Sequence, residues 1–109
     1  MNFKVGDRLY LYTARNCKFH IWEGEVFERK GRYYGRLAVK FKNRTQMEMC
    51  PKETAIGHIL GGGPRLWLTE RDDALARKLF LEYEEGKLFE LEKQVAKKRE
   101  LIKVLREGD

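Results

Sequence analysis

The stretch Gly61-Gly62-Gly63-Pro64-Arg65-Leu66-Trp67-Leu68-Thr69-Glu70-Arg71-Asp72 divides the chain into two parts of different composition. Residues before it are rich in aromatic and β-branched side chains punctuated by glycine, whereas residues after it are mostly Leu, Glu, Lys and Ala. The glycine run followed by proline is the strongest turn signal in the chain. Thr69, with a carboxylate three residues later, resembles the capping box that begins a helix. Strands followed by helices are typical of an α+β fold, so we predict a β domain over residues 1–68 and helices over residues 69–109.

The first part carries the signals of five short strands. Leucine and tyrosine alternate from Arg8 to Thr13, and this period of two indicates a half-buried strand. Gly24 interrupts the next apolar run and predicts a bulge or a sharp bend. The remaining strands are predicted over residues 32–41, over a stretch that carries Met47 and Met49 and ends at Pro51, and over residues 65–68.

Five bent strands in so short a segment are too few for a full two-sheet sandwich. They favour a small, partly open barrel of the SH3-like or OB-like type. We expect the SH3-like order, because the turn Val5-Gly6-Asp7 leads into a strand and then into a long bent hairpin. A turn at Lys30-Gly31 would pair Glu25 with Arg36, which is a favourable cross-strand pair. For the next hairpin we expect the three-residue loop 42–44, which keeps the apolar residues of its two strands opposite each other.

The second part reads as helix. Leu75, Leu79 and Tyr83 recur every four residues, as on one face of an amphipathic helix. Gly86-Lys87 then interrupts the pattern, so we predict two antiparallel helices that turn near Gly86. One long helix is the alternative, because glycine costs only about 1 kcal/mol inside a helix.

Beyond Gly86, apolar residues follow heptad spacing with Lys98 at the one polar position, a pattern typical of a helix that packs along a partner. This predicted partner-helix face comprises Leu88, Leu91, Val95, Ile102 and Leu105. Its partner is the preceding helix, the barrel, or a second copy of the chain, which would make a homodimer.

The charge is concentrated in the first part of the chain. The formal net charge is +6 from 23 Lys and Arg against 17 Asp and Glu, and it divides into +7 for residues 1–68 and −1 for residues 69–109. Most of the bases of the first part lie on one predicted strand and its two turns. A basic strip with interleaved aromatic rings is suited to backbone phosphates and unstacked bases. We therefore predict a nucleic-acid or anion site, the predicted basic strip, at Arg29, Lys30, Arg32, Tyr34, Arg36, Lys40, Lys42 and Arg44. The alternative is a solvated face neutralised by Glu23, Glu25 and Glu28, or one covered by the helices.

Other functional classes receive little support. The chain has no serine, which excludes serine nucleophiles, and no apolar run long enough to cross a membrane. Without a recognisable signal peptide, Cys17 and Cys50 are expected to be free thiols of a cytoplasmic protein. Cys17-x-x-His20 lies among Arg15 and Lys18, where a thiolate would be stabilised, but no orienting carboxylate accompanies it.

We therefore predict no catalytic residue, no metal site and no cofactor. Cys50 and His58 follow no usual zinc spacing. The segment Gly61–Arg65 matches no phosphate-loop pattern. We interpret it as a crossover loop, with a small-anion contact as the minority alternative.

The order of motifs resembles that of the small β-barrel-domain proteins carried by phages and prophages. The matching stretches are Phe3-Lys4-Val5-Gly6-Asp7-Arg8-Leu9-Tyr10, Leu66-Trp67-Leu68-Thr69-Glu70 and Gly86-Lys87-Leu88. The resemblance implies an accessory gene product without an assigned catalytic role. Many such proteins act against host defences by gripping a nucleoprotein, mimicking a ligand or sequestering a signalling nucleotide. This chain is basic, so it departs from the acidic proteins that mimic DNA.

Together these features predict a non-catalytic binding protein whose basic aromatic face holds nucleic acid or a nucleoprotein. Two alternatives remain at this point. One is a protein inhibitor or assembly factor that acts through the C-terminal helices. The other is a sponge for a small anionic nucleotide.

Overall fold

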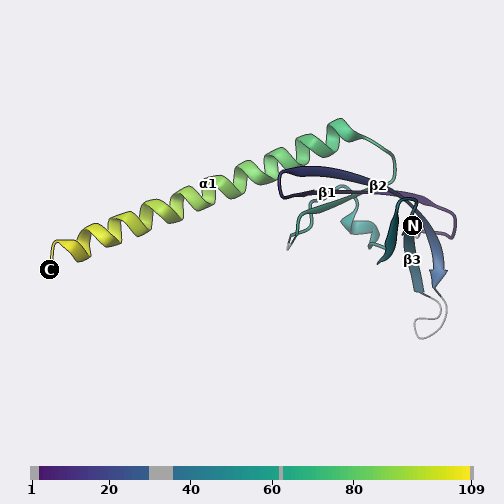
Figure 1. Cartoon of the computed structure of the whole chain (residues 1–109), viewed down its shortest axis with the longest axis horizontal. Coiled ribbons are helices and arrows are strands. Elements are labelled where there is room, and N and C mark those ends of the chain that lie inside the picture. The colour runs from purple at the N-terminus through teal and green to yellow at the C-terminus, as the bar shows by residue number, and fades with distance from the viewer. Residues whose placement is uncertain (1–2, 30–35, 62, 109) are drawn as a thin grey trace.

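A five-stranded antiparallel sheet is followed by one long helix in the computed structural model, which describes residues 3–29, 36–61 and 63–108 (Figure 1). The strands are paired in the order β4-β3-β2-β1-β5. The α+β class and the order of strands before helix are thereby confirmed. The elements are β1 (Arg8–Arg15), β2 (Lys18–Arg29), β3 (Arg36–Phe41), β4 (Arg44–Met49), the short 3₁₀ helix η1 (Glu53–Ala55), β5 (Arg65–Leu68) and α1 (Asp73–Arg106).

The sheet curves until side chains of its two edge strands meet. Arg65 on β5 places Nη2 2.7 Å from Oε1 of Glu48 on β4, and the rings of Phe41 on β3 and Trp67 on β5 lie 6.0 Å apart between centroids. Within the described residues no backbone pairing joins β4 to β5. The sheet is therefore a curved, open layer bridged by side chains, and closure into an SH3-like barrel stays a prediction.

Gly24 allows this curvature. It lies in the middle of β2, opposite Leu9 on β1 and Phe41 on β3, and it is buried. A Cβ at this position would collide with Cγ1 of Val39 and would lie 3.0 Å from two ring carbons of Phe41. Only a residue without a side chain lets the neighbouring strand fold this closely over β2.

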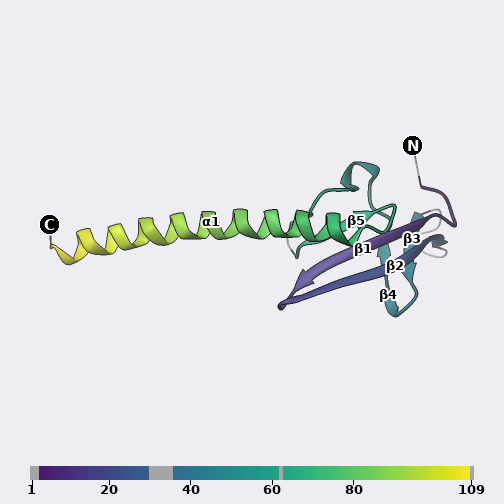
Figure 2. The ribbon, with the colours of Figure 1, turned by 90° about the horizontal axis from the view of Figure 1, so that it is seen from above.

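Each face of the sheet carries its own hydrophobic cluster, because side chains alternate along every strand. The first core lies on the concave face, where segment 50–60 also contributes Cys50, Ile56 and Leu60. Its buried members are Leu9, Leu11, Val26, Val39, Phe41 and Trp67. The second core lies between the opposite face and the beginning of α1 (Figure 2), and its buried members are Tyr12, Leu66, Leu68, Ala76 and Phe80.

Both predicted hairpin connections are wrong. In the first hairpin Arg29 is opposite Arg36, and Glu25 is opposite Lys40 instead of Arg36, so the connection is longer than a turn at Lys30-Gly31 and includes residues outside the description. The register keeps Val26 opposite Val39 in the first core. The predicted register is shifted by four residues and would place Val26 opposite residue 35 instead of Val39, so pairing these two buried valines stabilises the hairpin more than a surface ion pair would.

The second hairpin turns over two residues, since Phe41 is opposite Arg44. An irregularity between Val39 and Phe41 then places Glu48 opposite Val39. The predicted three-residue loop would have put Met47 there, and Met47 is instead 48% exposed. The longer loop was expected to set the register of β3 against β4. In the structure the turn is shorter, and the β-bulge changes the register instead.

The predicted helical hairpin is also wrong, because α1 is a single helix of 34 residues that contains Gly86. A Cβ on Gly86 would meet no atom within 4 Å, so no packing constraint requires a glycine at this position. Lys87 supplies no side-chain acceptor to cap a second helix. A break here would leave several backbone amides without partners, which costs more than one glycine in a helix.

The first turn of α1 is attached to the sheet through Tyr12. The buried Tyr12 hydroxyl donates to Oδ1 of Asp73 (2.8 Å) and accepts from the backbone N–H of Asp72 (3.0 Å). Asp72, and not Thr69, caps the helix, because its carboxylate accepts from the N–H of Leu75 (3.0 Å). Burial, followed by the hydrogen bond to Asp73, raises the pKa of Tyr12 from 10.0 to about 12.

Within the described part of the chain, no helix has the length and apolar character needed to cross a membrane.

Replacing Gly24 with Ala should lower the free energy of unfolding by about 1–3 kcal/mol, because the added methyl group overpacks the bend against Val39. Urea unfolding followed by Trp fluorescence measures this change. Gly86→Ala is the matched control: it should raise the helical circular-dichroism signal without lowering the unfolding midpoint. A Gly24→Ala variant with the same free energy of unfolding as the wild type would contradict the close approach at the bend. A smaller helical signal in Gly86→Ala would contradict a continuous α1.

Replacing Tyr12 with Phe should lower the free energy of unfolding by about 1–3 kcal/mol, because two partly buried hydrogen bonds are lost. The folded state holds Tyr12 protonated up to a pKa of about 12, whereas the unfolded chain ionises it near 10.0. The stability that Tyr12 provides is therefore complete below the unfolded pKa and declines as the pH rises toward the folded pKa. Urea unfolding over this pH range should show the difference between the wild type and Tyr12→Phe becoming smaller. A difference independent of pH would contradict the attachment of α1 through this hydroxyl.

Candidate nucleic-acid interface

A hollow of about 360 Å³ opens on the concave face, next to the turn between β1 and β2. We call it the basic hollow. It lies on the same face of the sheet as the first core, closer to the β1–β2 turn, where the residues on this face are polar. Its lining residues are Thr13, Arg15, Asn16, Lys18, His20, Trp22, Arg44 and Arg65.

Strand register brings these residues together from distant parts of the sequence. Thr13 on β1 is opposite His20 on β2 and also opposite Arg65 on β5. One step toward the core, Leu11 is opposite Trp22 and Trp67. Opposite residues share a face of the sheet, so the face that is apolar at Leu11 becomes basic and aromatic beyond Thr13.

A tight turn places two cations at the rim of the hollow. Asn16 and Cys17 both adopt left-handed backbone conformations, with φ of 50° and 62°, as the two central residues of a type I′ turn do. Arg15 and Lys18 therefore stand opposite each other, and both are exposed. The Arg15 guanidinium lies against Gly63, where a Cβ would come within 2.6 Å of Nη2.

Stacked rings line the interior of the hollow. The His20 and Trp22 rings lie 5.3 Å apart between centroids and 25° from parallel. The Arg44 guanidinium lies 4.9 Å from the centroid of the Trp22 ring and 5.3 Å from that of Phe41. These contacts hold a planar cation and an aromatic surface in fixed positions.

The charge of the hollow is positive. Glu48 lies 3.0 Å from Arg44 and 2.7 Å from Arg65, so a single carboxylate bridges two guanidinium groups. Among residues 3–29, 36–61 and 63–108, none that lines the hollow is acidic, and no carboxylate lies within 4.0 Å of Arg15 or Lys18. A phosphate at the rim would therefore meet cations without displacing an acid.

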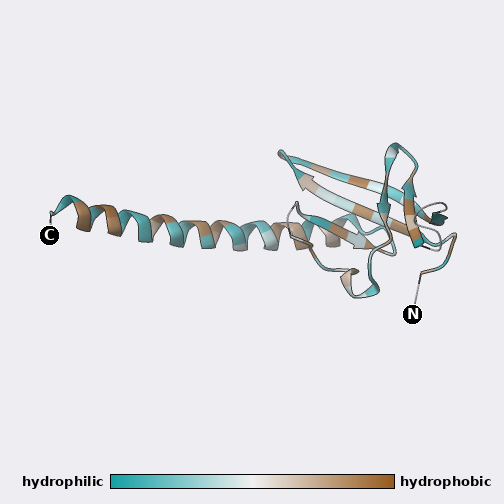
Figure 3. Cartoon of the chain, turned by 90° about the horizontal axis from the view of Figure 1, so that it is seen from below, coloured by the Kyte–Doolittle hydropathy of each residue, from teal (hydrophilic) through white to brown (hydrophobic). Residues whose placement is uncertain are grey.

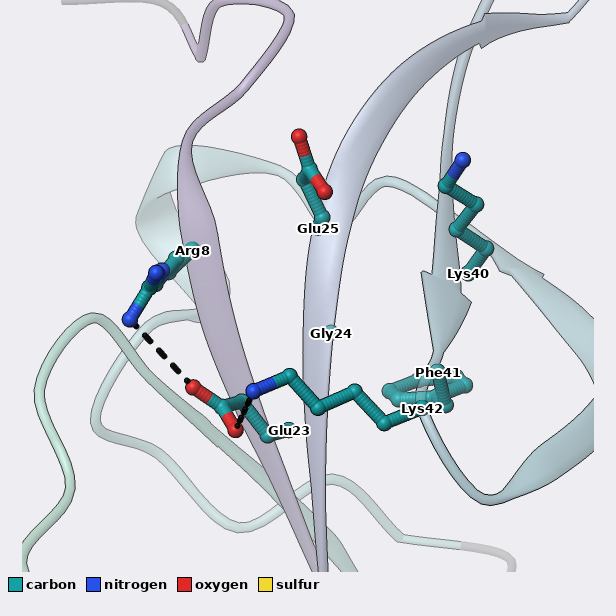
Figure 4. Close-up of a pocket in the computed structure, with 7 residues that line it drawn as sticks. All are labelled: Arg8, Glu23, Gly24, Glu25, Lys40, Phe41 and Lys42. Carbon is teal, nitrogen blue, oxygen red and sulfur yellow. Dashed lines mark ion pairs between the residues drawn. The ribbon is translucent and has the colours of Figure 1, made fainter.

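The predicted basic strip is divided by the fold. Lys40 and Lys42 line a second hollow together with Arg8, Glu23 and Glu25 (Figure 4). Glu23 lies 2.8 Å from Lys42 and 3.6 Å from Arg8, and the hydrogen bond from Lys42 holds the pKa of the Glu23 carboxyl below its usual value. Acids thus accompany these bases, as the alternative of a neutralised face requires.

The other described members of the strip lie at two further places. Arg29 and Arg36 are opposite each other at the far end of β2 and β3. Of the described members, Arg44 alone lines the basic hollow, and the alternation of side chains places it on the face of the sheet opposite to Lys40. Lys30, Arg32 and Tyr34 lie outside the described residues.

Sequence reasoning did not assemble the basic hollow, although it noted Arg15 and Lys18 beside Cys17, and Arg65 after the glycine run. The available signal was the alternation of β1, which places Arg15 two positions beyond Thr13 on the face that carries Leu9 and Leu11. The partners on β2, β4 and β5 required the strand order, which the sequence does not state.

The cysteines stand apart from each other and from the hollow's interior. Cys17 is exposed in its turn, whereas Cys50 is half-buried against the first core, and burial raises the pKa of its thiol. In the part of the chain that the structure describes, no three His, Cys, Asp or Glu residues are grouped to hold a metal ion.

Comparison of the chain with protein-family models, with curated proteins and with solved structures finds no significant match.

Proposed function

We propose that this protein binds single-stranded nucleic acid, without catalysing a reaction, through the basic hollow. The observation that carries the proposal is the combination of four cationic side chains with a stacked His20–Trp22 pair around one opening. Phosphate contacts supply most of the affinity of such sites, and aromatic rings add about 1–3 kcal/mol for each stacked base.

The positions of the groups suit a strand that crosses the rim. Arg15 and Lys18 are exposed at the tip of the β1–β2 hairpin, where they would contact successive phosphates. His20, which is exposed, and Trp22, which is half-buried, follow on the same face, where an unstacked base would meet their rings. Arg44 and Arg65 are held by Glu48, and they would keep the interior positive without having to rearrange.

The size of the opening favours one strand over a duplex. A hollow of about 360 Å³ is near the lower end of the range for small-ligand sites. It suits one splayed base with its sugar, whereas a duplex presents its bases stacked and inaccessible to such a cavity.

The proposal includes two further elements from the sequence. One is that the curved sheet is an SH3-like barrel whose edges the Glu48–Arg65 ion pair holds together. The other is a phage-type accessory role, in which the bound strand belongs to a host nucleic acid or nucleoprotein. The short motifs described above support that role.

Replacing both Arg15 and Lys18 with Ala should weaken binding to an oligothymidylate and reduce its salt dependence. Loss of two phosphate contacts should lower the slope of log K against log salt concentration by roughly 1.4. Fluorescence anisotropy of a labelled oligonucleotide over a series of salt concentrations measures both quantities.

The matched control is Lys40→Ala with Lys42→Ala, which removes the same charge from the acid-containing hollow. This control should keep the wild-type slope. An equal loss in both double variants would show that only net charge matters and would overturn the assignment to the basic hollow. Thymidine monophosphate that binds as tightly as the oligonucleotide would instead identify a small-anion sponge and would overturn the proposed function.

A further inference from the structure

The part of α1 beyond the sheet has an apolar face that the chain itself does not cover. Within α1 only Ala76 and Phe80 are buried, and every described residue from Glu84 to Gly108 is exposed. Bands of hydrophobic residues nevertheless recur along the whole projecting helix (Figure 3). The partner-helix face is accordingly exposed in every member, with side chains between 46% and 68% accessible: Leu88, Leu91, Val95, Ile102 and Leu105.

The structure removes two of the three partners that the sequence allowed. A preceding helix cannot cover this face, because residues 73–106 form one helix. The sheet does not cover it, since every described residue of α1 from Glu84 onward is exposed. A second copy of the chain is the occupant that remains, and the charge pattern beside the face gives a specific argument for it.

The heptad pattern begins one repeat earlier than the sequence analysis placed it. Leu81 is 59% exposed and lies seven residues before Leu88. In heptad notation the a positions are Leu81, Leu88, Val95 and Ile102. The d positions are Glu84, Leu91, Lys98 and Leu105. A row of apolar a and d residues is the contact surface of a coiled coil.

The e positions that flank this face reverse their charge halfway along the helix. They are Glu85 and Glu92, followed by Arg99 and Arg106. In an antiparallel coiled coil the e positions of one helix face those of the other. A second copy running in the opposite direction therefore presents its arginines to the glutamates of the first.

We propose that two copies of this chain associate through α1 as an antiparallel coiled coil in one register. In this register Leu88 packs on Leu105 of the second copy, and Leu91 packs on Ile102 of the second copy. The same register pairs Glu85 with Arg106 and Glu92 with Arg99 across the interface. Each of these pairs occurs twice, because the arrangement is two-fold symmetric.

Charge excludes the neighbouring registers. A shift of one heptad in one direction brings Glu92 against Glu92 of the second copy. A shift in the other direction brings Arg99 against Arg99. Only the intermediate register pairs every facing e position with the opposite charge, and like-charge pairs along helices are destabilising.

A parallel arrangement fits less well. It would place the two Lys98 side chains in the same layer of the interface, whereas the antiparallel register places each Lys98 opposite Val95. It would also bring together two sheet regions with a charge of +7 each, which repel each other. Facing e and g positions would then include only one attractive combination, Lys87 with Glu92.

The length of the free helix agrees with the proposed register. The pairing uses the helix from Glu84 to its end, so the C-terminal end of the second copy reaches the point where α1 leaves its own sheet. The two sheets then lie at opposite ends of the helix pair and do not compete for space.

The test begins with the mass of the wild type and of Arg99→Glu/Arg106→Glu, measured by sedimentation equilibrium over a wide range of protein concentration. The wild type should reach twice the 13.0 kDa mass of the chain. The double variant makes every facing e pair acidic, so the dissociation constant should rise on the order of a hundredfold. Glu85→Arg/Glu92→Arg should dissociate to a similar extent, and an equimolar mixture of the two variants should restore the dimer.

The matched control is Lys97→Glu/Lys103→Glu, which changes the charge equally at positions outside the interface and should remain dimeric. A monomeric wild type at all concentrations would overturn the proposal. Dissociation caused by Lys87→Glu, with Arg99→Glu/Arg106→Glu unaffected, would show a parallel dimer and would also overturn it. If the control dissociated to the same extent, the effect would be one of overall charge, and the proposal would also be overturned.

Discussion

The curvature of the sheet requires a residue without a side chain at Gly24. Any Cβ at that point would collide with Val39, so glycine is what lets β3 fold closely over β2. The bend carries β4 toward β5, where Glu48 meets Arg65 and Phe41 meets Trp67. The same bend brings the Arg44 guanidinium over the Trp22 ring. The basic hollow is therefore a consequence of curvature, because a flat sheet would leave Arg44 and Arg65 on opposite edges.

A second attachment separates the helix from this site. Tyr12 faces away from the first core and holds the first turn of α1 through Asp72 and Asp73, while Arg71 and then Tyr12 keep the pKa of the Asp73 carboxyl low. The helix thus leaves the sheet from the face opposite the hollow. As a result, the proposed strand site and the proposed dimer surface do not overlap. An antiparallel dimer would carry two hollows, and a strand long enough to reach both sites would bind more tightly than to either alone.

Much of the fold could be predicted from local signals. The alternation of Leu and Tyr over residues 8–13 indicated the first strand, and the signals of the other strands, before and directly after the glycine–proline run at residues 61–64, indicated an α+β fold with strands before helix, as observed. The heptad pattern was sufficient for the apolar face of the helix. The break at Gly86 was predicted wrongly, because glycine was weighed without the missing cap at Lys87. Both hairpin connections were wrong because register depends on which residues reach the core, as the Val26–Val39 pair shows.

The candidate site was less predictable, because its members meet only through strand order. Lys40 and Arg44 are four residues apart and seemed to share one basic strip. The two-residue turn and the bulge instead place Arg44 over Trp22 and leave Lys40 with Glu25. Thr13, His20 and Arg65 become neighbours through pairings of β1 with both β2 and β5. No pattern within a single segment indicates those pairings.

The intrinsic fluorescence of the two tryptophans reports whether a strand binds in the basic hollow. Trp22 lines the basic hollow, whereas Trp67 is 2% exposed in the first core. Addition of an oligothymidylate should quench the wild-type emission as a base packs against the His20–Trp22 pair, and the quenching should disappear in Trp22→Phe, which retains only Trp67 and keeps an aromatic ring in the hollow. Quenching that persists in Trp22→Phe, or saturable binding with no quenching in the wild type, would contradict a strand seated in the basic hollow.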